Sequence, residues 1–193
     1  TSAIFDPRFN EFRGVIVAGN PVFMFAGRFP VGIEFYQQEH LGHEFEFVGV
    51  RDPFFMADEK IPSGKLFKRG YSISIKQKFY NPMKAGMWYF GHEVRFTNLG
   101  HFVNIATMTG PDNIFTVSSV EQRIEWGVLL GYRLMRRNNA RGFTLDAFVS
   151  VDVGYRGFDA DSQYEVYFQN LNHSSLSTSF HFGLNLGNVF SFK

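Results

Sequence analysis

The chain has 193 residues, a length typical of one domain, and we expect residues 1–193 to form a single domain. It contains no cysteine, which excludes disulfide bonds, thiolate metal sites and thiol nucleophiles, and its formal net charge of +1 gives no electrostatic basis for binding nucleic acid. Aromatic residues make up 18% of the chain, with 25 phenylalanines, yet the mean hydropathy of -0.13 is that of a polar protein.

Alternation of apolar and polar residues predicts strands along most of the chain. Seven segments show it, and a first strand at 12–25 would give the even number that is usual in bacterial single-chain barrels. At Val48 and Val50 the alternation breaks, which predicts a bulge or a slip in register. In chain order, the predicted strands are 12–25, 31–38, 43–52, 67–80, 88–97, 121–134, 143–156 and 176–192.

The segment 121–134 shows the alternation best. Ile124, Trp126 and Val128 share one face of the expected strand, and Arg123 and Glu125 share the other. A transmembrane β-barrel turns an apolar face to lipid and a polar face to its lumen. We therefore predict an all-β fold, an eight-stranded antiparallel up-and-down transmembrane β-barrel. The uncharged, largely apolar stretch 14–27 contains Asn20 and Pro21 and falls short of the roughly 20 apolar residues of a membrane helix.

The connections between these strands are expected to alternate in length. Short turns are predicted at 39–42, 81–86 and 135–141, and long loops at 53–66, 98–119 and 157–175. Outer-membrane barrels have short periplasmic turns and long outer loops. The pattern predicts that both termini are periplasmic. A first residue other than methionine, without a basic and apolar leader, is typical of an exported chain whose signal peptide has been removed.

A soluble lipocalin-like carrier is the main structural alternative, because it is also an eight-stranded up-and-down barrel. Its large apolar side chains would point inward around a ligand, and alternation alone does not say which face is inside. Small residues and balanced charges on the polar face, and aromatic residues near the strand ends, favour the membrane barrel.

The polar face carries charges of both signs, which would lie in the lumen. Buried charges are tolerated when they are paired, so we predict a plugged polar lumen filled by ion pairs. An eight-stranded barrel has little room for more than side chains, which argues against a diffusion pore, and a proton or ion pathway is the functional alternative. The predicted lumen charges are Glu34, Glu44, Glu46, Glu93, Glu125, Asp146, Asp152, Lys68, Lys76, Lys78, Arg95, Arg123, Arg133 and Arg156.

Several segments suggest a family. The stretches 31–36 (Val-Gly-Ile-Glu-Phe-Tyr), 45–49, 75–80 (Ile-Lys-Gln-Lys-Phe-Tyr) and 87–92 (Met-Trp-Tyr-Phe-Gly-His) combine a strand ending in a Glu-aromatic pair with a later basic-aromatic strand. In this the chain resembles small outer-membrane barrels of Bacteroidota, a group of uncharacterised proteins. Its end at 190–192 (Phe-Ser-Phe), followed by Lys193, resembles the aromatic signal read by the barrel-assembly machinery. The resemblance implies an accessory component of an envelope machine, such as a secretion or barrel-assembly complex.

Lipid A modification is the enzymatic alternative, because some eight-stranded barrels remodel lipid A with a His, a Ser and an acid near the outer rim. The candidates would be His173, Ser174, Ser175 and an acid, Asp161 or Glu165. The deacylases of this barrel size carry a His-x-Ser-Asn signature, and here Leu176 occupies the last position. Adjacency in a polar loop does not establish a catalytic geometry. We predict no enzyme, with no catalytic residues, no cofactor and no metal site.

Three further histidines and a pair of acids give no sign of a catalytic or metal site. By alternation, His92 beside Glu93 faces lipid or a partner, where packing against a neighbouring protein is a better interpretation than catalysis. His43 and His101 are predicted to be isolated, without metal-ligand spacing. Asp159 and Asp161 have the spacing of a loose calcium loop but lack its glycine and final glutamate, so we expect them to be solvated.

We therefore expect a non-enzymatic barrel in the bacterial outer membrane, acting as a structural or accessory subunit, or scaffold, of an outer-membrane protein complex. Its expected partners are outer-membrane lipid, lipopolysaccharide and other outer-membrane proteins, with no nucleic acid. A patch of polar residues on the lipid-facing wall, with His92 the first candidate, would mark the docking site of another membrane protein.

Overall fold

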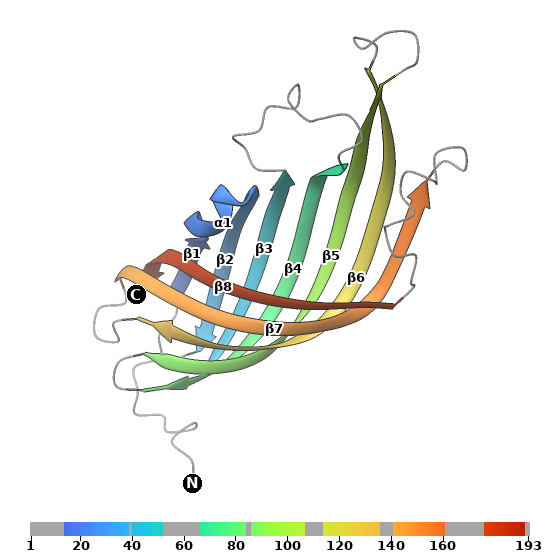
Figure 1. Ribbon diagram of the computed structural model, residues 1–193. Coiled ribbons are helices and arrows are strands. Elements are labelled where there is room, and N and C mark those ends of the chain that lie inside the picture. The colour runs from blue at the N-terminus through green and yellow to red at the C-terminus, as the bar shows by residue number, and fades with distance from the viewer. Residues whose placement is uncertain are drawn as a thin grey trace.

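The computed structural model describes residues 14–38, 40–51, 66–83, 86–106, 114–135, 141–160 and 176–191. Each strand pairs antiparallel with the next in the chain, and β8 pairs with β1, so the fold is one ring-like sheet of eight up-and-down strands (Figure 1). The strands are β1 (Gly14–Gly19), β2 (Arg28–Gln38), β3 (Leu41–Arg51), β4 (Leu66–Pro82), β5 (Met87–Ala106), β6 (Ile114–Leu134), β7 (Arg141–Ala160) and β8 (Leu176–Ser191).

The first strand differs from its prediction. Only six residues of the predicted strand 12–25 form β1, and a short helix, α1 (Pro21–Phe25), follows it. The Asn20 side chain caps this helix by accepting a hydrogen bond of 3.1 Å from the Phe23 N–H, and Pro21 favours the first helical position. Gly27, with φ of 75°, then turns the chain into β2. The prediction of strand over 20–25 was wrong because these helix-start residues end β1.

The strand pairing corrects two further expectations. The register between β3 and β4 is regular through Val48 and Val50, so the predicted bulge or slip is absent; both valines keep the parity of Glu44 and Glu46. The predicted loop 98–119 was too long, because β5 continues to Ala106 and β6 begins at Ile114. In Figure 1 these two strands project beyond the others.

Connection length alternates around the ring as predicted. The described strands are separated by the intervals 39–40, 83–86 and 135–140 at one end and by 20–27, 52–65, 107–113 and 161–175 at the other. Each interval of the second group is longer than its neighbours along the chain, although 107–113 only slightly. Gly14 pairs with Ser191, so the first and last described residues lie together (Figure 1). They lie at the end of the ring that carries the short intervals.

The polar face of the sheet lies inside the ring, and the apolar face lies outside. Lys76 is 2% exposed and Glu93 is 1% exposed, whereas Val128 is 54% exposed and Phe90 is 63% exposed. Alternation alone did not say which face of the sheet lies inside. In the structure the charged face of β2 to β7 lies inside, as predicted. We call the outward-facing apolar surface of the strands the wall.

Within the described ranges, no helix has the length and apolar character needed to cross a membrane.

Candidate functional site

A network of buried ion pairs fills the ring near the end that carries the termini. Lys78 Nζ lies 3.1 Å from Glu34 Oε2 and 3.3 Å from Asp146 Oδ2, and it also contacts Glu44. Arg133 Nη2 lies 2.6 Å from Asp146 Oδ2 and 2.8 Å from Glu34 Oε2. Lys76 joins the network through Glu44 Oε1 at 2.9 Å. These side chains come from five strands and lock opposite sides of the ring together.

Three tyrosines complete this network. The Arg133 Nη1 group donates to the Tyr36 hydroxyl at 2.6 Å, the Tyr89 hydroxyl donates to Asp146 Oδ1 at 2.7 Å, and the Tyr80 hydroxyl donates to Glu34. The Arg133 guanidinium lies 5.5 Å from the centre of the Tyr80 ring. A buried charge needs partners for its hydrogen-bonding groups, and here the tyrosines supply several of them. We call the six charged residues and three tyrosines the ion-pair plug.

A second set of polar contacts lies further along the interior. Glu125 accepts hydrogen bonds from Ser177 at 2.7 Å and Ser179 at 3.1 Å. His181 Nε2 lies 3.1 Å from Asp152 Oδ2. Arg95 Nη2 lies 2.9 Å from Glu93 Oε2. These contacts involve β5, β6, β7 and β8. They form separate small groups, whereas the residues of the ion-pair plug form one connected network.

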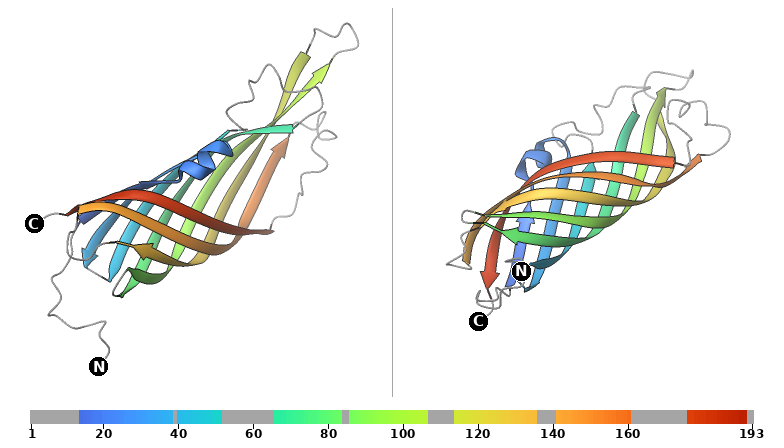
Figure 2. Two further views of the ribbon diagram at one scale, coloured as in Figure 1. Left: turned by 60° about the vertical axis from the view of Figure 1, so that its left-hand side comes forward. Right: turned by 90° about the horizontal axis from the view of Figure 1, so that it is seen from below.

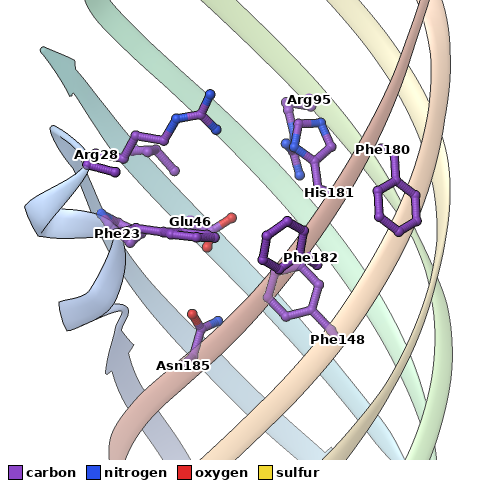
Figure 3. Close-up of a pocket in the computed structure, with 12 residues that line it drawn as sticks. Phe23, Arg28, Glu46, Arg95, Phe148, Phe180, His181, Phe182 and Asn185 are labelled. Atoms are coloured by element: carbon purple, nitrogen blue, oxygen red, sulfur yellow. The ribbon is translucent and has the colours of Figure 1, made fainter. Parts of the chain in front are cut away.

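A cavity of about 520 Å³ lies beside this second set, between α1 and β8 (Figure 3). Its polar lining consists of Arg28, Glu46, Arg95, His181 and Asn185. In Figure 3 the Arg28 side chain extends toward Arg95 and His181. The remaining lining is apolar or small and comprises Phe23, Ala26, Pro30, Val48, Phe148, Phe180 and Phe182. We call this space the seam cavity, and sequence reasoning gave no sign of it.

His101 is not isolated, contrary to the prediction. It is fully buried, and its Nε2 lies 2.6 Å from Glu121 Oε2. Glu121 also pairs with Arg156 at 3.1 Å and with Arg123. The Phe158 ring packs edge-on to the imidazole, 5.9 Å between ring centres. The prediction failed because 98–119 was interpreted as a loop, whereas His101 lies inside β5.

The outer surface carries one row of polar side chains within the wall. His43 of β3 is the direct cross-strand partner of Gln77 of β4, and Gln77 is the partner of His92 of β5. His92 Nε2 and Gln77 Oε1 are 2.9 Å apart. His92 therefore points outward, as predicted, and His43 lies in the same row. We call His43, Gln77 and His92 the outer polar row.

The remaining predicted residues divide into three groups. Lys68 is exposed, contrary to its predicted place in the lumen, because it lies near the end of β4 beside His101. Asp159 is exposed on β7, in the orientation expected of a solvated acid. The lipid A candidates lie outside the described residues: His173, Ser174, Ser175, Asp161 and Glu165.

In the part of the chain that the structure describes, no three His, Asp or Glu side chains converge in a group that could hold a metal ion. Comparisons with protein-family models, with curated proteins and with solved structures give no match. The features of the described structure that bear on function are therefore the wall, the ion-pair plug, the seam cavity and the outer polar row.

Proposed function

We propose that this protein is an integral β-barrel of the bacterial outer membrane that serves as a structural or accessory subunit of a larger outer-membrane complex. The observation that carries the proposal is the inverted burial of the sheet. Trp126 is 52% exposed and Phe182 is 62% exposed, while Arg133 and Asp146 are each 1% exposed. In water this arrangement would expose a continuous apolar surface, and in a bilayer it would match the solvent on each side.

The interior does not suit a soluble carrier or a wide pore. A lipocalin-like carrier needs an apolar interior for its ligand, whereas the ion-pair plug is charged and internally paired. Water-filled porins use about 16 strands, and an eight-stranded ring leaves room for little more than side chains. The plug therefore supports a structural role for the lumen.

The outer polar row supports a protein partner. Polar side chains facing hydrocarbon are costly, and hydrogen bonds across an interface with another membrane protein offset that cost. His92 and Gln77 already satisfy one another in part, and His43 extends the row across three adjacent strands. Phe79 packs beside His92, 6.4 Å between ring centres, so apolar contacts surround the polar ones. The partner would be another outer-membrane protein, with the termini of this chain in the periplasm.

The test starts from native membranes. We expect the protein to remain in the membrane after an alkaline carbonate wash, to need mild detergent for release, and to co-purify stoichiometrically with a larger outer-membrane protein identified by mass spectrometry. The double variant Gln77→Leu and His92→Leu should keep the barrel in the membrane and lose the partner. Thr178→Val is the matched control, because Thr178 is an outward polar residue on β8, opposite β4 in the ring.

The outcomes separate the two parts of the proposal. Release of the protein by carbonate without detergent would contradict membrane insertion. Purification as a lone monomer, or a partner that the double variant retains, would contradict the accessory role at this surface.

A further inference from the structure

The ring has a short seam where β1 meets β8. β1 has six residues, and it pairs with 31–36 of β2 and with 186–191 of β8. The remaining part of β8, 176–185, and the start of β2, 28–30, have no β1 partner. α1 stands in this place, beside β2 and β8 (Figure 2). The Phe23 and Phe182 rings pack edge to face, 5.8 Å between ring centres.

The seam cavity reaches through this seam. Its lining includes Phe180, His181 and Phe182, three consecutive residues of β8. Successive residues of a strand point to opposite faces, and Phe180 and Phe182 belong to the exposed outer face while His181 points inward. A space lined by both faces of one strand passes around the edge of that strand. The cavity therefore connects the polar interior with the wall.

Two arginines at the cavity have side-chain donors without a partner among the described residues. Within the described residues, the side chain of Arg28 makes no hydrogen bond or ion pair, and the buried Arg95 Nε has no partner. Glu46, the acid of the lining, accepts through Oε2 from Lys76 at 2.7 Å and from Ser74 at 3.3 Å, and the Lys76 ammonium offsets its charge. Among the described residues, the fully buried carboxylate oxygens without a partner belong to Glu93 and Asp152, which do not line the cavity. The cavity therefore favours a ligand with an anionic head.

We propose that the seam cavity binds a single-chain anionic amphiphile of the long-chain fatty acid class. Its carboxylate would lie between Arg28 and Arg95, and its alkyl chain would pass between α1 and β8 along Phe23, Phe180 and Phe182. A volume of about 520 Å³ is in the range of small-molecule sites. Entry from the surrounding bilayer rests on the proposed membrane insertion, while the donors and the phenylalanines belong to the described fold.

The proposal can be tested with the purified protein in phosphatidylcholine nanodiscs, with empty nanodiscs as the measure of simple partitioning. We expect palmitate to bind with one-to-one stoichiometry above that background, by native mass spectrometry and by isothermal titration. Arg28→Gln should weaken binding about tenfold or more, because a hydrogen bond to a charged group is lost. Arg69→Gln is the matched control, since Arg69 is an exposed arginine on β4 outside the cavity.

Two comparison ligands separate the contribution of the charged head to binding from that of the alkyl chain. Hexadecanol has the same chain without the charge, and inorganic phosphate has charge without the chain; we expect both to bind at least tenfold more weakly than palmitate, since each lacks one of the two recognition elements. Phe182→Ala should also weaken the binding of palmitate. The folding of this variant is checked by heat-modifiable gel mobility. Equal binding of hexadecanol or of phosphate, or palmitate retention no higher than in empty discs, would overturn the proposal.

The result can be separated from that of the proposed function. Failure of the protein to enter the nanodiscs would contradict membrane insertion, whereas failure of the inserted protein to bind palmitate would contradict only the ligand site.

Discussion

The wall and the far ends of β5 and β6 differ in polarity along the same two strands. In the wall, Glu93 and Glu125 point inward and Val94 and Trp126 point outward. Beyond it, Leu99, Val103 and Val117 are buried beside the His101–Glu121 pair, while the Asn104 and Thr116 side chains on the outer face share a hydrogen bond of 2.9 Å. We call this second region, 98–106 of β5 and 114–122 of β6, the extension.

The change of polarity occurs over one step of the pairing. Phe96 of β5 pairs with Ile124 of β6, and the next outward pair along the strands is Asn98 with Gln122. An apolar outer surface suits lipid, and a largely polar outer surface over a partly apolar interior suits water. Under the proposed insertion, the outer boundary of the membrane would fall between these two pairs, and the extension would stand in the aqueous phase.

The largest expected effect comes from removing a charge inside the wall. Arg133→Met leaves Glu34 and Asp146 with Lys78 as their remaining cation, and loss of one partner of a buried ion pair costs about 3–5 kcal/mol. We expect that loss in the free energy of unfolding, measured by guanidinium titration in phosphatidylcholine vesicles. Arg123→Met is the control. The Arg123 side chain is 24% exposed, so its ion pair with Glu121 should contribute less than about 1 kcal/mol to the free energy of unfolding. Equal losses in the two variants would contradict the special role of the plug.

A charge on the outside of the wall should have the next largest effect. Val128→Lys places an ammonium group among outward apolar side chains and should cost about 2–4 kcal/mol if this position lies near the middle of the bilayer. The matched variant Ser118→Lys lies on the outer face of the extension and should change stability by less than about 0.5 kcal/mol. The same vesicle titration measures both. Tolerance of lysine at both positions would contradict the assignment of the wall to lipid.

The smallest effect is expected inside the extension. Val117→Thr buries a hydroxyl group beside Val103, its direct cross-strand neighbour, and should cost about 1 kcal/mol in that region. Hydrogen exchange of the amides of β5 and β6 would detect faster opening of the extension, with the ion-pair plug unchanged. Thr116→Val on the outer face is the control and should shift exchange little. Faster exchange in Thr116→Val than in Val117→Thr would reverse the assignment of inner and outer faces.

The sequence predicted the wall strands well because their alternation is uninterrupted. It failed at 98–119, because 98–106 and 114–119 carry apolar and polar residues on both faces, so the two-residue period of the wall is lost there. The residue types of the ion-pair plug were predicted from alternation, but the roles of Tyr36, Tyr80 and Tyr89 were not, because pairing across the ring depends on strand stagger. Alternation could not predict the seam cavity, because the cavity depends on where β1 ends. Pro21 after Asn20 was the available signal for that end.

The shortness of β1 also bears on how the molecule assembles. β1 and β8 are the pair of strands most distant in the sequence, so bringing them together costs more chain entropy than forming any hairpin between neighbours, and six residues give little hydrogen bonding in return. We therefore expect the seven hairpins between consecutive strands, from β1–β2 to β7–β8, to form before β1 pairs with β8 and closes the ring. The β1–β8 pairing would be the last step of folding and the first to reverse under denaturant or force.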